Sequence, residues 1–400
     1  MTAAAPSTPS APLARWEGWR YVLPLFLASR VLLYVAAVAA PYLLAPQVFS
    51  TGLAHETDAS QYWCRWDAGW YATIAESGYA YDPETTSSVA FFPLFPMLMR
   101  GLAWAGMPAW GAGMLLANIA TLVLLFVFYR WLRREFEPPA VAEAATALLA
   151  FCPQSCWFII GYTEPLFLLT AVAALSAARQ GRWTGAALWA LAHGLTRSNG
   201  ITLALPLLCI AWPELRQMWA TGSFRAMLRP AVAIVGAWFG HAAYLAYLWA
   251  EFGTWQANQI TSKAGWGVQM VFDAEHLRQK IPGIGLHLFR HPVLRSEWIV
   301  WSWFLALAAT VFSAIALREK RQPLFWFAAL AAFWSLFLLT SECNWLTGSM
   351  GRFAAGLFPV PVAMALFAQD RPWARPCFFA LNAGLAVLNI ALVFAGYHIV

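Results

Sequence analysis

Apolar runs that are long enough to cross a lipid bilayer recur along almost the whole chain. A hydrocarbon core of roughly 30 Å takes about 20 helical residues to cross. Stretches such as VLPLFLASRVLLYVAAVAA and LLANIATLVLLFVFYRWL are continuously apolar and lack the alternation of a β-barrel strand. Lipid offers no partner for a backbone N–H or C=O, so such runs must form helices. The sequence therefore predicts an all-α, polytopic transmembrane helical bundle.

The predicted bundle has about eleven helices. Their ranges are 21–45, 111–131, 140–160, 164–178, 184–196, 199–212, 230–250, 296–317, 323–341, 353–368 and 376–398. The polar RSNG between the fifth and sixth ranges indicates two short or broken helices. Composition agrees with a membrane protein, because 11% of the 400 residues are charged, against roughly 25% in an ordinary soluble domain.

Clusters of basic residues set the predicted orientation. Cytoplasmic connections carry an excess of Lys and Arg, and a cytoplasmic N-terminus places most basic clusters inside. The first outer loop, 47–90, has six acidic residues and a single Arg, which agrees. The second outer loop, 251–295, carries five Lys or Arg residues and disagrees, although long loops weigh less in this rule. The net charge of +6 is thus attributed to the basic residues that orient the helices in the membrane, not to a surface that binds nucleic acid.

The chain divides into a tail and one membrane domain. Residues 1–14 are rich in Ala, Pro and Ser and are expected to be disordered, and 15–400 is expected to be a single transmembrane domain. The segment 91–107 contains two prolines and Arg100, so it is predicted to be interfacial rather than spanning. Residues 47–110 would then form the first extracytoplasmic loop with its interfacial segment.

The six cysteines contain no CxxC pair, so a zinc or redox motif is not expected. Cys64 and Cys343 both fall in predicted outer loops. Two interpretations fit these positions, a disulfide between the two residues and a pair of free thiols.

Four polar stretches end on the predicted outer side. They are RWDAGWYATIAESGY (65–79), GYTEP (161–165), TRSNG (196–200) and ECNWLTGSMGRF (342–353). Polar groups gathered at the ends of several spanning helices are what a membrane-embedded site for a charged or sugar substrate requires. The candidate substrate-binding residues are Arg65, Trp66, Trp70, Phe92, Tyr162, Glu164, Arg197, Asn199 and Arg352.

Asp67 is the candidate catalytic residue. It lies among aromatic residues, with Arg65 two positions away. A carboxylate that an arginine keeps ionised can accept a proton from a hydroxyl nucleophile. Trp66 and Trp70 are predicted to be platforms for the face of a sugar. The alternative interpretation is a solvated loop carboxylate.

Three other candidates have structural alternatives. Glu164 precedes Pro165 at a helix start and would suit a capping role. Arg197 lies within about one turn of the interface and could extend its guanidinium to water. Asn199 is followed by Gly200, which is typical of a turn between two short helices.

The sequence also restricts the donor and the cofactors. It carries no Walker motif and no GxGxxG after a strand, so a soluble nucleotide sugar is not the expected donor. A lipid-linked donor that is reached from within the bilayer suits the architecture better. No His, Asp and Glu cluster has clear metal-ligand spacing, so no cofactor is required, but one carboxylate could bind a divalent ion.

The order of these motifs resembles that of the PIG-V-type mannosyltransferases, which comprise the second mannosyltransferase of GPI-anchor synthesis and its bacterial relatives. The matching stretches run from RWDAGWYATIAESGY through AFFPLFP, CPQSCWFIIGYTEPLF and TRSNG to SMGRF, and the resemblance covers about residues 20–365. It implies a GT-C-type glycosyltransferase fold, a polyprenyl-phosphate mannose donor and inversion at the anomeric carbon.

The resemblance also assigns roles. Asp67, paired with Trp66, occupies the position of the family's acidic residue in the first outer loop. Phe92 belongs to the FFP element, Tyr162 and Glu164 to the Tyr-x-Glu element, and Arg197 to the Arg-Ser-Asn-Gly element. Arg197 or Arg352 would offset the charge of the leaving phosphate. The acceptor, whether lipid-linked, glycan or protein, stays open. A bacterial chain of this kind would lie in the plasma (inner) membrane.

Two other functions also fit the sequence. Broken helices and intramembrane charge are features of transporters and lipid flippases. A non-catalytic subunit of a membrane complex is the third interpretation, and it predicts that Asp67→Asn leaves function intact.

Overall fold

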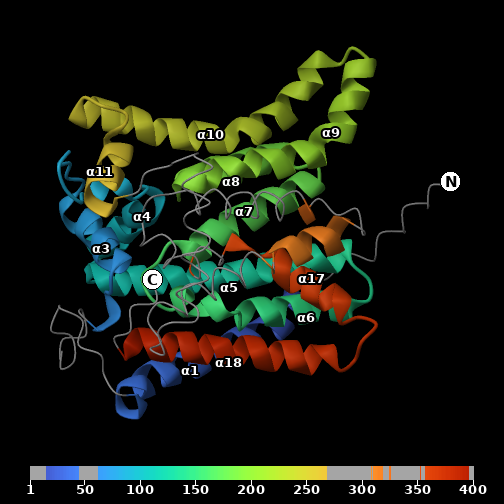
Figure 1. Cartoon of the computed structure of the whole chain (residues 1–400). Coiled ribbons are helices and arrows are strands. Elements are labelled where there is room, and N and C mark those ends of the chain that lie inside the picture. Colours follow the sequence, from blue (N-terminus) through green and yellow to red (C-terminus); the bar gives the residue numbers. More distant parts are fainter. Residues whose placement is uncertain are drawn as a thin grey trace, which may run out of the picture.

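The computed structural model describes residues 15–44, 62–267, 308, 310–318, 324–325, 352 and 356–395. Every regular element in these ranges is helical, and the longer helices run roughly side by side (Figure 1). The elements are α1 (Arg15–Leu43), α3 (Asp67–Ser77), η2 (Ser88–Ala90), α4 (Leu94–Trp104), α5 (Ala109–Glu135), α6 (Pro139–Ala150), η3 (Pro153–Phe158), α7 (Glu164–Arg179), α8 (Trp183–Gly194), η4 (Ser198–Leu203), α9 (Ala204–Ala220), α10 (Phe224–Phe252), α11 (Ala257–Trp266), α17 (Pro359–Phe367) and α18 (Ala374–Phe394).

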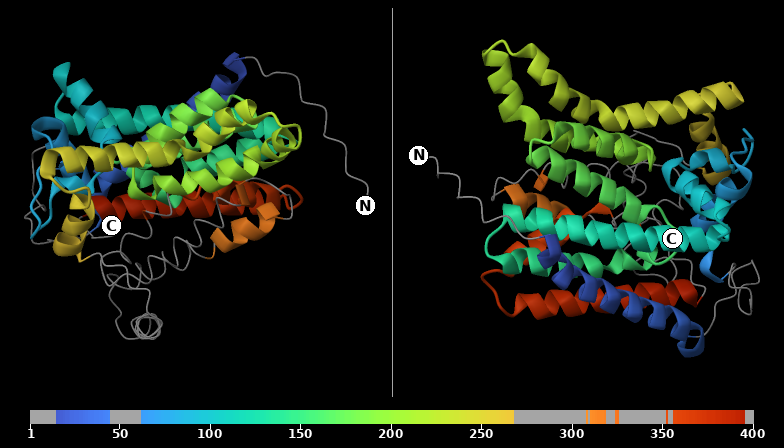
Figure 2. Two further views of the ribbon diagram at one scale, coloured as in Figure 1. Left: turned by 90° about the horizontal axis from the view of Figure 1, so that it is seen from above. Right: turned by 180° about the vertical axis from the view of Figure 1, so that it is seen from behind.

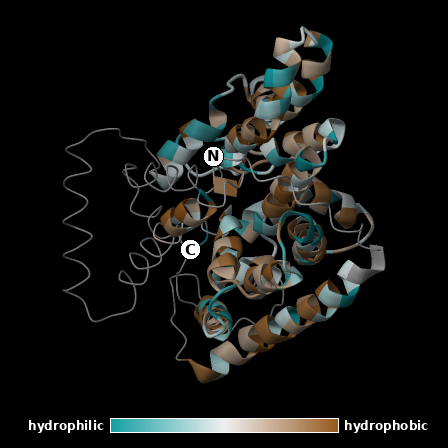
Figure 3. Ribbon diagram, turned by 90° about the vertical axis from the view of Figure 1, so that its right-hand side faces the viewer, coloured by the Kyte–Doolittle hydropathy of each residue, from teal (hydrophilic) through white to brown (hydrophobic). Residues whose placement is uncertain are grey.

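Within the described ranges, four helices are long and apolar enough to cross a membrane. They comprise Gly18–Leu43 within α1 and the whole of α5, α10 and α18. Figure 3 shows hydrophobic ribbon along many of the helices, with hydrophilic positions between. The prediction of an all-α integral membrane protein is confirmed at this level. Some predictions concern residues outside the described ranges and stay predictions. They are the count of about eleven helices, the disordered tail at 1–14, the state of Cys343 and most of the loop 251–295.

The predicted span at 140–160 is wrong. α6 ends at Ala150, and the chain continues through the short 3₁₀ helix η3. The cause is Pro153, because proline has no N–H to donate within a helix and forces the preceding residue into extended backbone. Cys152 accordingly has φ −64° and ψ 154°.

The segment 91–107 contains the 11-residue helix α4, which is too short to cross a bilayer and packs against α3. Arg100 explains part of that packing. Its Nε donates to Ala75 O at 2.8 Å and its Nη2 to Ile74 O at 2.9 Å. A cation at the carboxyl end of a helix is favourable, since the last carbonyls there lack partners within the helix. Arg100 therefore caps α3.

The centre of the bundle is α7, which packs against α5 on one side and α8 on the other (Figures 1 and 2). Almost all of its residues are buried. A helix that is apolar around its whole circumference is expected in such a central position. The amino end of α7 thus begins inside the molecule rather than on its surface.

Helices α8 and α10 approach each other through glycines. A Cβ added at Gly194 of α8 would lie 1.9 Å from Ala237 O, and one added at Gly240 of α10 would lie 2.1 Å from Leu191 O. Gly236 and Gly240 form the small-xxx-small pattern that lets membrane helices pack closely. The backbones are in contact here because no side chain separates them.

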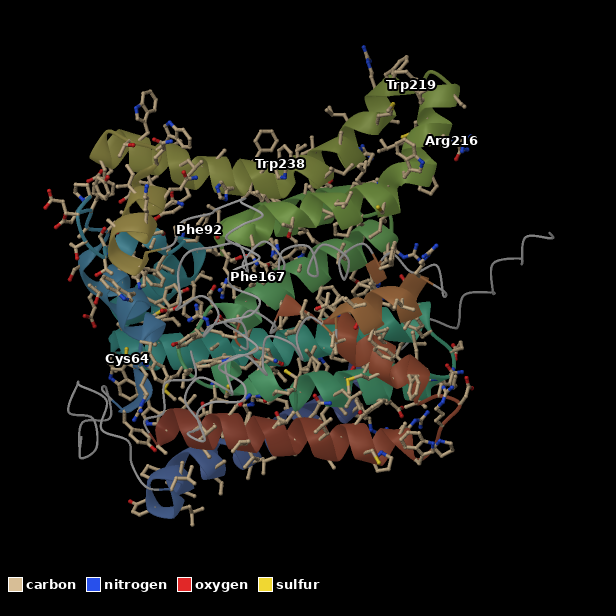
Figure 4. All side chains as sticks on the ribbon, in the orientation of Figure 1. Cys64, Phe92, Phe167, Arg216, Trp219 and Trp238 are labelled. Atoms are coloured by element: carbon tan, nitrogen blue, oxygen red, sulfur yellow. The ribbon has the colours of Figure 1, made fainter. Side chains whose placement is uncertain are left out.

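The two ends of the bundle differ. Cys64, beside α3, and Arg216, in the α9–α10 hairpin, lie at opposite ends of the molecule (Figure 4). The acidic first loop and a basic cluster are therefore separated along the helix direction. The orientation that the basic clusters indicate stays a prediction.

Candidate functional site

Four charged side chains from distant parts of the chain meet beside α7. Arg352 Nη1 donates to Asp67 Oδ2, and Arg352 Nε lies 3.3 Å from Glu164 Oε1. Arg197 Nη1 donates to the same Glu164 oxygen at 2.5 Å. We call Asp67, Glu164, Arg197 and Arg352 the charged quartet. Its two carboxylates and two guanidinium groups balance in formal charge.

The members of the charged quartet differ in accessibility. The exposed fraction of the side chain is 4% for Glu164, 9% for Arg352, 17% for Arg197 and 22% for Asp67. Buried charge is tolerated when it is paired, as it is here. Asp67 is thus the carboxylate that a substrate could reach. Glu164 is buried and pairs with both arginines.

Asp67 begins α3, so its carboxylate lies in the first turn, where the helix dipole favours negative charge. The residue before it, Trp66, has φ 47°, a left-handed conformation that is uncommon for a side chain of this size. Its ring lies 6.3 Å from the ring of Trp157, edge to face. Backbone strain of this kind persists only where the surroundings impose it, so the entry into α3 is tightly determined.

Glu164 begins α7 and is followed by Pro165 in the first turn, as the sequence predicts. The N-cap residue Thr163 makes no side-chain hydrogen bond that caps the helix, and the Glu164 carboxylate accepts from Arg197 and pairs with Arg352. A second oxygen, Oε2, is buried without a hydrogen-bond partner among the described residues. The role of Glu164 is therefore to hold the arginines, and its position in the first turn adds a favourable dipole interaction.

Tyr162 lies beneath Arg352. The guanidinium carbon is 5.5 Å from the centre of the Tyr162 ring, a cation–π contact. The Tyr162 hydroxyl donates to Arg65 O at 3.3 Å. Burial alone would lower the pKa of Arg352, but the charges of Asp67 and Glu164 raise this pKa above its ordinary value. Arg352 is therefore always charged and is held by three neighbours.

The structure corrects the role expected of Arg65. The ion-pair partner of Asp67 among the described residues is Arg352, not Arg65. The guanidinium of Arg65 is buried, with Nε donating to Tyr62 O at 3.0 Å and Nη1 to Val393 O at 3.1 Å. It also lies over the Phe394 ring at 5.3 Å. Arg65 ties the start of α3 to the end of α18.

Phe92, which the sequence predicts to bind substrate, is buried away from the charged quartet. It is 3% exposed and packs against Tyr244 and His241 of α10, with ring centres 4.8 Å and 5.1 Å away. Figure 4 shows it beneath α10. These contacts place Phe92 in a separate apolar cluster with Val89 and Leu248. The prediction that it contacts substrate is therefore not supported.

Two further predicted site residues, Trp70 and Asn199, take no part in the ion pairs of the charged quartet. The ring of Trp70 stacks on Phe91 at 5.7 Å and meets Trp266 edge to face at 5.8 Å. Asn199 lies in η4, where its carbonyl accepts from Thr202 Oγ1 at 2.8 Å. Its side-chain Oδ1 is buried and has no hydrogen-bond partner among the described residues. The turn role expected for Asn199 and Gly200 fits this geometry.

Metal ligands do not gather at this site. The ranges that the structure describes contain no group of three or more His, Cys, Asp or Glu side chains that could hold an ion. The two carboxylates of the charged quartet are instead neutralised by guanidinium groups.

Sequence reasoning named all four quartet residues but not their pairing. It also missed Trp157, which lies within the quoted CPQSCWF stretch.

The first half of the chain is similar to proteins of known family. Residues 34–214 match the family model described as Mannosyltransferase (PIG-V). GPI alpha-1,6-mannosyltransferase 2 of Mus musculus is 32% identical over 148 residues, which cover 34% of this chain and 29% of that protein. Part of the chain therefore resembles the PIG-V mannosyltransferases. GPI mannosyltransferase 2 of Drosophila pseudoobscura is 29% identical over 163 residues, covering 36% of this chain and 35% of that protein.

The PIG-V match includes Asp67, Glu164 and Arg197, whereas Arg352 lies beyond it. The chain spans about a third of the length of the curated relatives that it matches. Among solved structures, the Archaeoglobus fulgidus oligosaccharyltransferase tethered with an acceptor peptide aligns with a TM-score of 0.47 and 15% identity, over 96% of this chain and 56% of that one. The same enzyme in complex with an inhibitory peptide and a dolichol-phosphate gives 0.45 and 13%, over 96% and 57%.

Proposed function

We propose that this chain is an inverting mannosyltransferase of the PIG-V type. It transfers mannose from a polyprenyl-phosphate donor to a hydroxyl of a lipid-linked, glycan or protein acceptor. The charged quartet is the observation that carries the proposal, because it combines an accessible carboxylate with two cations. Glycosyl transfer from a lipid phosphate needs a base for the acceptor and positive charge for the leaving group. The names of the relatives support mannose as the sugar.

In the proposed step, Asp67 is the general base. The acceptor oxygen attacks the anomeric carbon of mannose while the bond from that carbon to the phosphate oxygen breaks. The hydroxyl proton passes to the Asp67 carboxylate, and polyprenyl phosphate leaves with the bonding electron pair. One displacement inverts the configuration at the anomeric carbon. Trp66, beside Asp67, would present its ring to the sugar.

The arginines of the charged quartet would stabilise the departing phosphate. Guanidinium groups bind phosphate oxygens with paired hydrogen bonds, and preorganised cations are most effective in a water-poor site. Glu164 holds Arg197 and Arg352 in one place before the donor binds. Because two cations already face the leaving group, the reaction requires no metal. Transfer that continues in excess EDTA would agree with this proposal, and a loss restored by Mg²⁺ or Mn²⁺ would overturn it.

The proposed setting is a GT-C-type bundle of about eleven helices in the plasma membrane of a bacterium, with a cytoplasmic N-terminus. The site would then face the extracytoplasmic side. The separation of Cys64 from Arg216 along the bundle supports this orientation.

The test is transfer of labelled mannose from polyprenyl-phosphate mannose in membranes that contain equal amounts of wild type or Asp67→Asn. Loss of a general base lowers the rate by about 10²–10⁴-fold. Glu76→Gln is the matched control, because Glu76 is an exposed carboxylate on the same helix. Retained activity in Glu76→Gln and lost activity in Asp67→Asn support the proposal. Equal transfer by wild type and Asp67→Asn would remove Asp67 from the mechanism.

A further inference from the structure

An arginine lies in the middle of the first membrane helix. Arg30 is 12 residues after Gly18 and 13 before Leu43, the ends of the apolar span. At a rise of 1.5 Å per residue, these separations correspond to roughly 18–20 Å. Arg30 is 6% exposed, so it faces the bundle rather than lipid. A charged group at this depth is costly, and in membrane proteins it commonly serves function.

Arg30 and its neighbour Tyr34 each donate to one backbone carbonyl at the end of η3. Arg30 Nη1 donates to Phe158 O at 3.0 Å, and the hydroxyl of Tyr34, one turn further along α1, donates to Ile159 O at 3.2 Å. Asn118 of α5 links the two, since its Nδ2 donates to the Tyr34 hydroxyl at 2.9 Å and its Oδ1 lies 3.5 Å from Arg30 Nη1. We call Arg30, Tyr34 and Asn118 the carbonyl clamp.

The carbonyl clamp acts on backbone that has no helical partners of its own. Residues 159–163, between η3 and α7, are not helical. At membrane depth, irregular backbone is tolerated only where protein groups satisfy it. The segment also packs closely against α5. A Cβ added at Gly161 would lie 3.4 Å from Gly113 Cα, which leaves little space for a side chain. Hydrogen bonds from the clamp and close packing at Gly161 together fix this segment.

The fixed segment leads directly into the site. Tyr162 is three residues after Ile159, and Glu164 is six after Phe158. Tyr162 lies under Arg352, and Glu164 pairs with Arg352 and Arg197. The same short stretch of backbone thus joins the carbonyl clamp to the charged quartet.

We propose that the carbonyl clamp is a positioning unit for the transfer reaction. It holds the break before α7 so that Tyr162 and Glu164 direct Arg352 toward the departing phosphate. This inference rests on the proposed function. Arg30 acts through the backbone, and its contacts are made with Ser29, Asn118 and Phe158 rather than with the quartet. A displacement of about 1 Å in a site of this kind can lower a rate about 100-fold.

The test compares Arg30→Met with Thr121→Val in the purified full chain. Thr121 is buried in α5 near Asn118, and its hydroxyl bonds to Ala117 O of its own helix. The first readout is the maleimide labelling rate of Cys156, a buried thiol within η3, resolved by mass spectrometry. Arg30→Met should label about tenfold faster than wild type, because loss of a buried hydrogen bond from a charged donor favours local opening of the segment. Thr121→Val should label like wild type.

The second readout is kinetic. Arg30→Met should lower kcat by about tenfold or more and leave the KM for acceptor within about twofold, because the clamp is proposed to act on the arginines that stabilise the departing phosphate. Arg30→Lys should recover part of kcat, since it keeps a charged donor. Tyr34→Phe removes a single hydroxyl and should lower kcat about threefold. If Arg30→Met does not accumulate in folded form, Tyr34→Phe decides the outcome.

Two results would overturn the inference. One is Cys156 labelling in both Arg30→Met and Tyr34→Phe that matches Thr121→Val. The other is a kcat loss that Thr121→Val shares. Absence of mannose transfer by wild type would refute the proposed function instead, and the labelling experiment would still decide whether the clamp fixes the break.

Discussion

The α8–α10 interface and the break before α7 are held in opposite ways. At the interface, Gly194 and Gly240 bring backbones into contact, and the fit depends on the absence of side chains. At the break, Arg30 and Tyr34 donate hydrogen bonds to the buried carbonyls of Phe158 and Ile159, and Asn118 donates to the Tyr34 hydroxyl, so the fit depends on polar groups being present. The α8–α10 interface is therefore sensitive to added side-chain volume, whereas the break before α7 is sensitive to the loss of a hydrogen-bond donor.

The difference follows from what each region must do. Close packing of small residues stabilises membrane helices without polar groups, which suits a scaffold. A site for a phosphate and a sugar needs carboxylates and guanidinium groups inside the bundle, and each needs a partner. The charged quartet therefore sits where a helix begins inside the molecule, and polar side chains from α1 and α5 support the broken backbone.

The largest effect is expected from removing the charge that joins the two arginines. Glu164→Gln would leave Arg197 and Arg352 with one carboxylate between them, and breaking a buried pair costs about 3–5 kcal/mol of stability. Mannose transfer should fall by at least about 100-fold as well, because the cations lose their fixed positions. Thermal unfolding of the purified protein and transfer assays at equal folded protein measure the two effects.

The matched control for this change is Glu135→Gln. Glu135 also pairs with an arginine, at 2.6 Å, but the Arg179 side chain is 40% exposed. Exposed pairs contribute about 0–1 kcal/mol, so this variant should unfold and transfer much like wild type. Equal destabilisation by the two variants would show that burial of the quartet is not what matters. The double variant Glu164→Gln with Arg197→Gln should regain stability, because charge balance returns, but not activity.

A smaller effect is expected at the α8–α10 interface. Gly240→Ala places a methyl group 2.1 Å from Leu191 O, so the helices must separate. Overpacking of this kind costs about 1–3 kcal/mol. Gly185→Ala in α8 is the control, because its new Cβ would meet Ala177 Cβ at 3.8 Å, an ordinary contact. The unfolding temperature should drop for Gly240→Ala alone, while transfer per folded molecule is retained. A change in activity without a change in stability would refute the scaffold role.

The sequence predicts the long helices well because their signal is local. α1, α5, α10 and α18 are continuous apolar runs, and α7 begins at Glu164 because Pro165 suits a first turn. The break after α6 was missed, although Pro153 marks it, because apolar residues continue on both sides. Apolar periodicity is therefore a poor guide where a helix ends inside the bundle.

The pairing within the site is not a local property, which is why the sequence did not reveal it. Asp67 and Arg352 are 285 residues apart. Proximity along the chain favoured Arg65 as the partner, but a helix start can turn neighbouring side chains in different directions. Trp66, with its positive φ, lies between Arg65 and Asp67 and separates them in this way. Candidate residues can thus be named from motifs, whereas their partners depend on the fold.

Arg65 provides the sharpest test of this distinction. Arg65→Met would remove hydrogen bonds to Tyr62 O and Val393 O while keeping an apolar stem against Phe394. Each hydrogen bond contributes about 0.5–1.5 kcal/mol net, so loss of the two should lower the free energy of unfolding by roughly 1–3 kcal/mol. Transfer per folded molecule should stay within about twofold of wild type, since the Asp67 partner Arg352 is intact.

The opposite result for Arg65→Met would carry a definite meaning. A loss of transfer as large as that of Asp67→Asn, with unchanged unfolding, would place Arg65 in the reaction as its position along the chain suggests. Arg65→Lys separates the two roles further, because it keeps the charge but loses the planar fork that reaches two carbonyls. If Arg65 is a tether, the lysine variant should resemble Arg65→Met in stability. If Arg65 supplies charge to Asp67, the lysine variant should instead recover transfer.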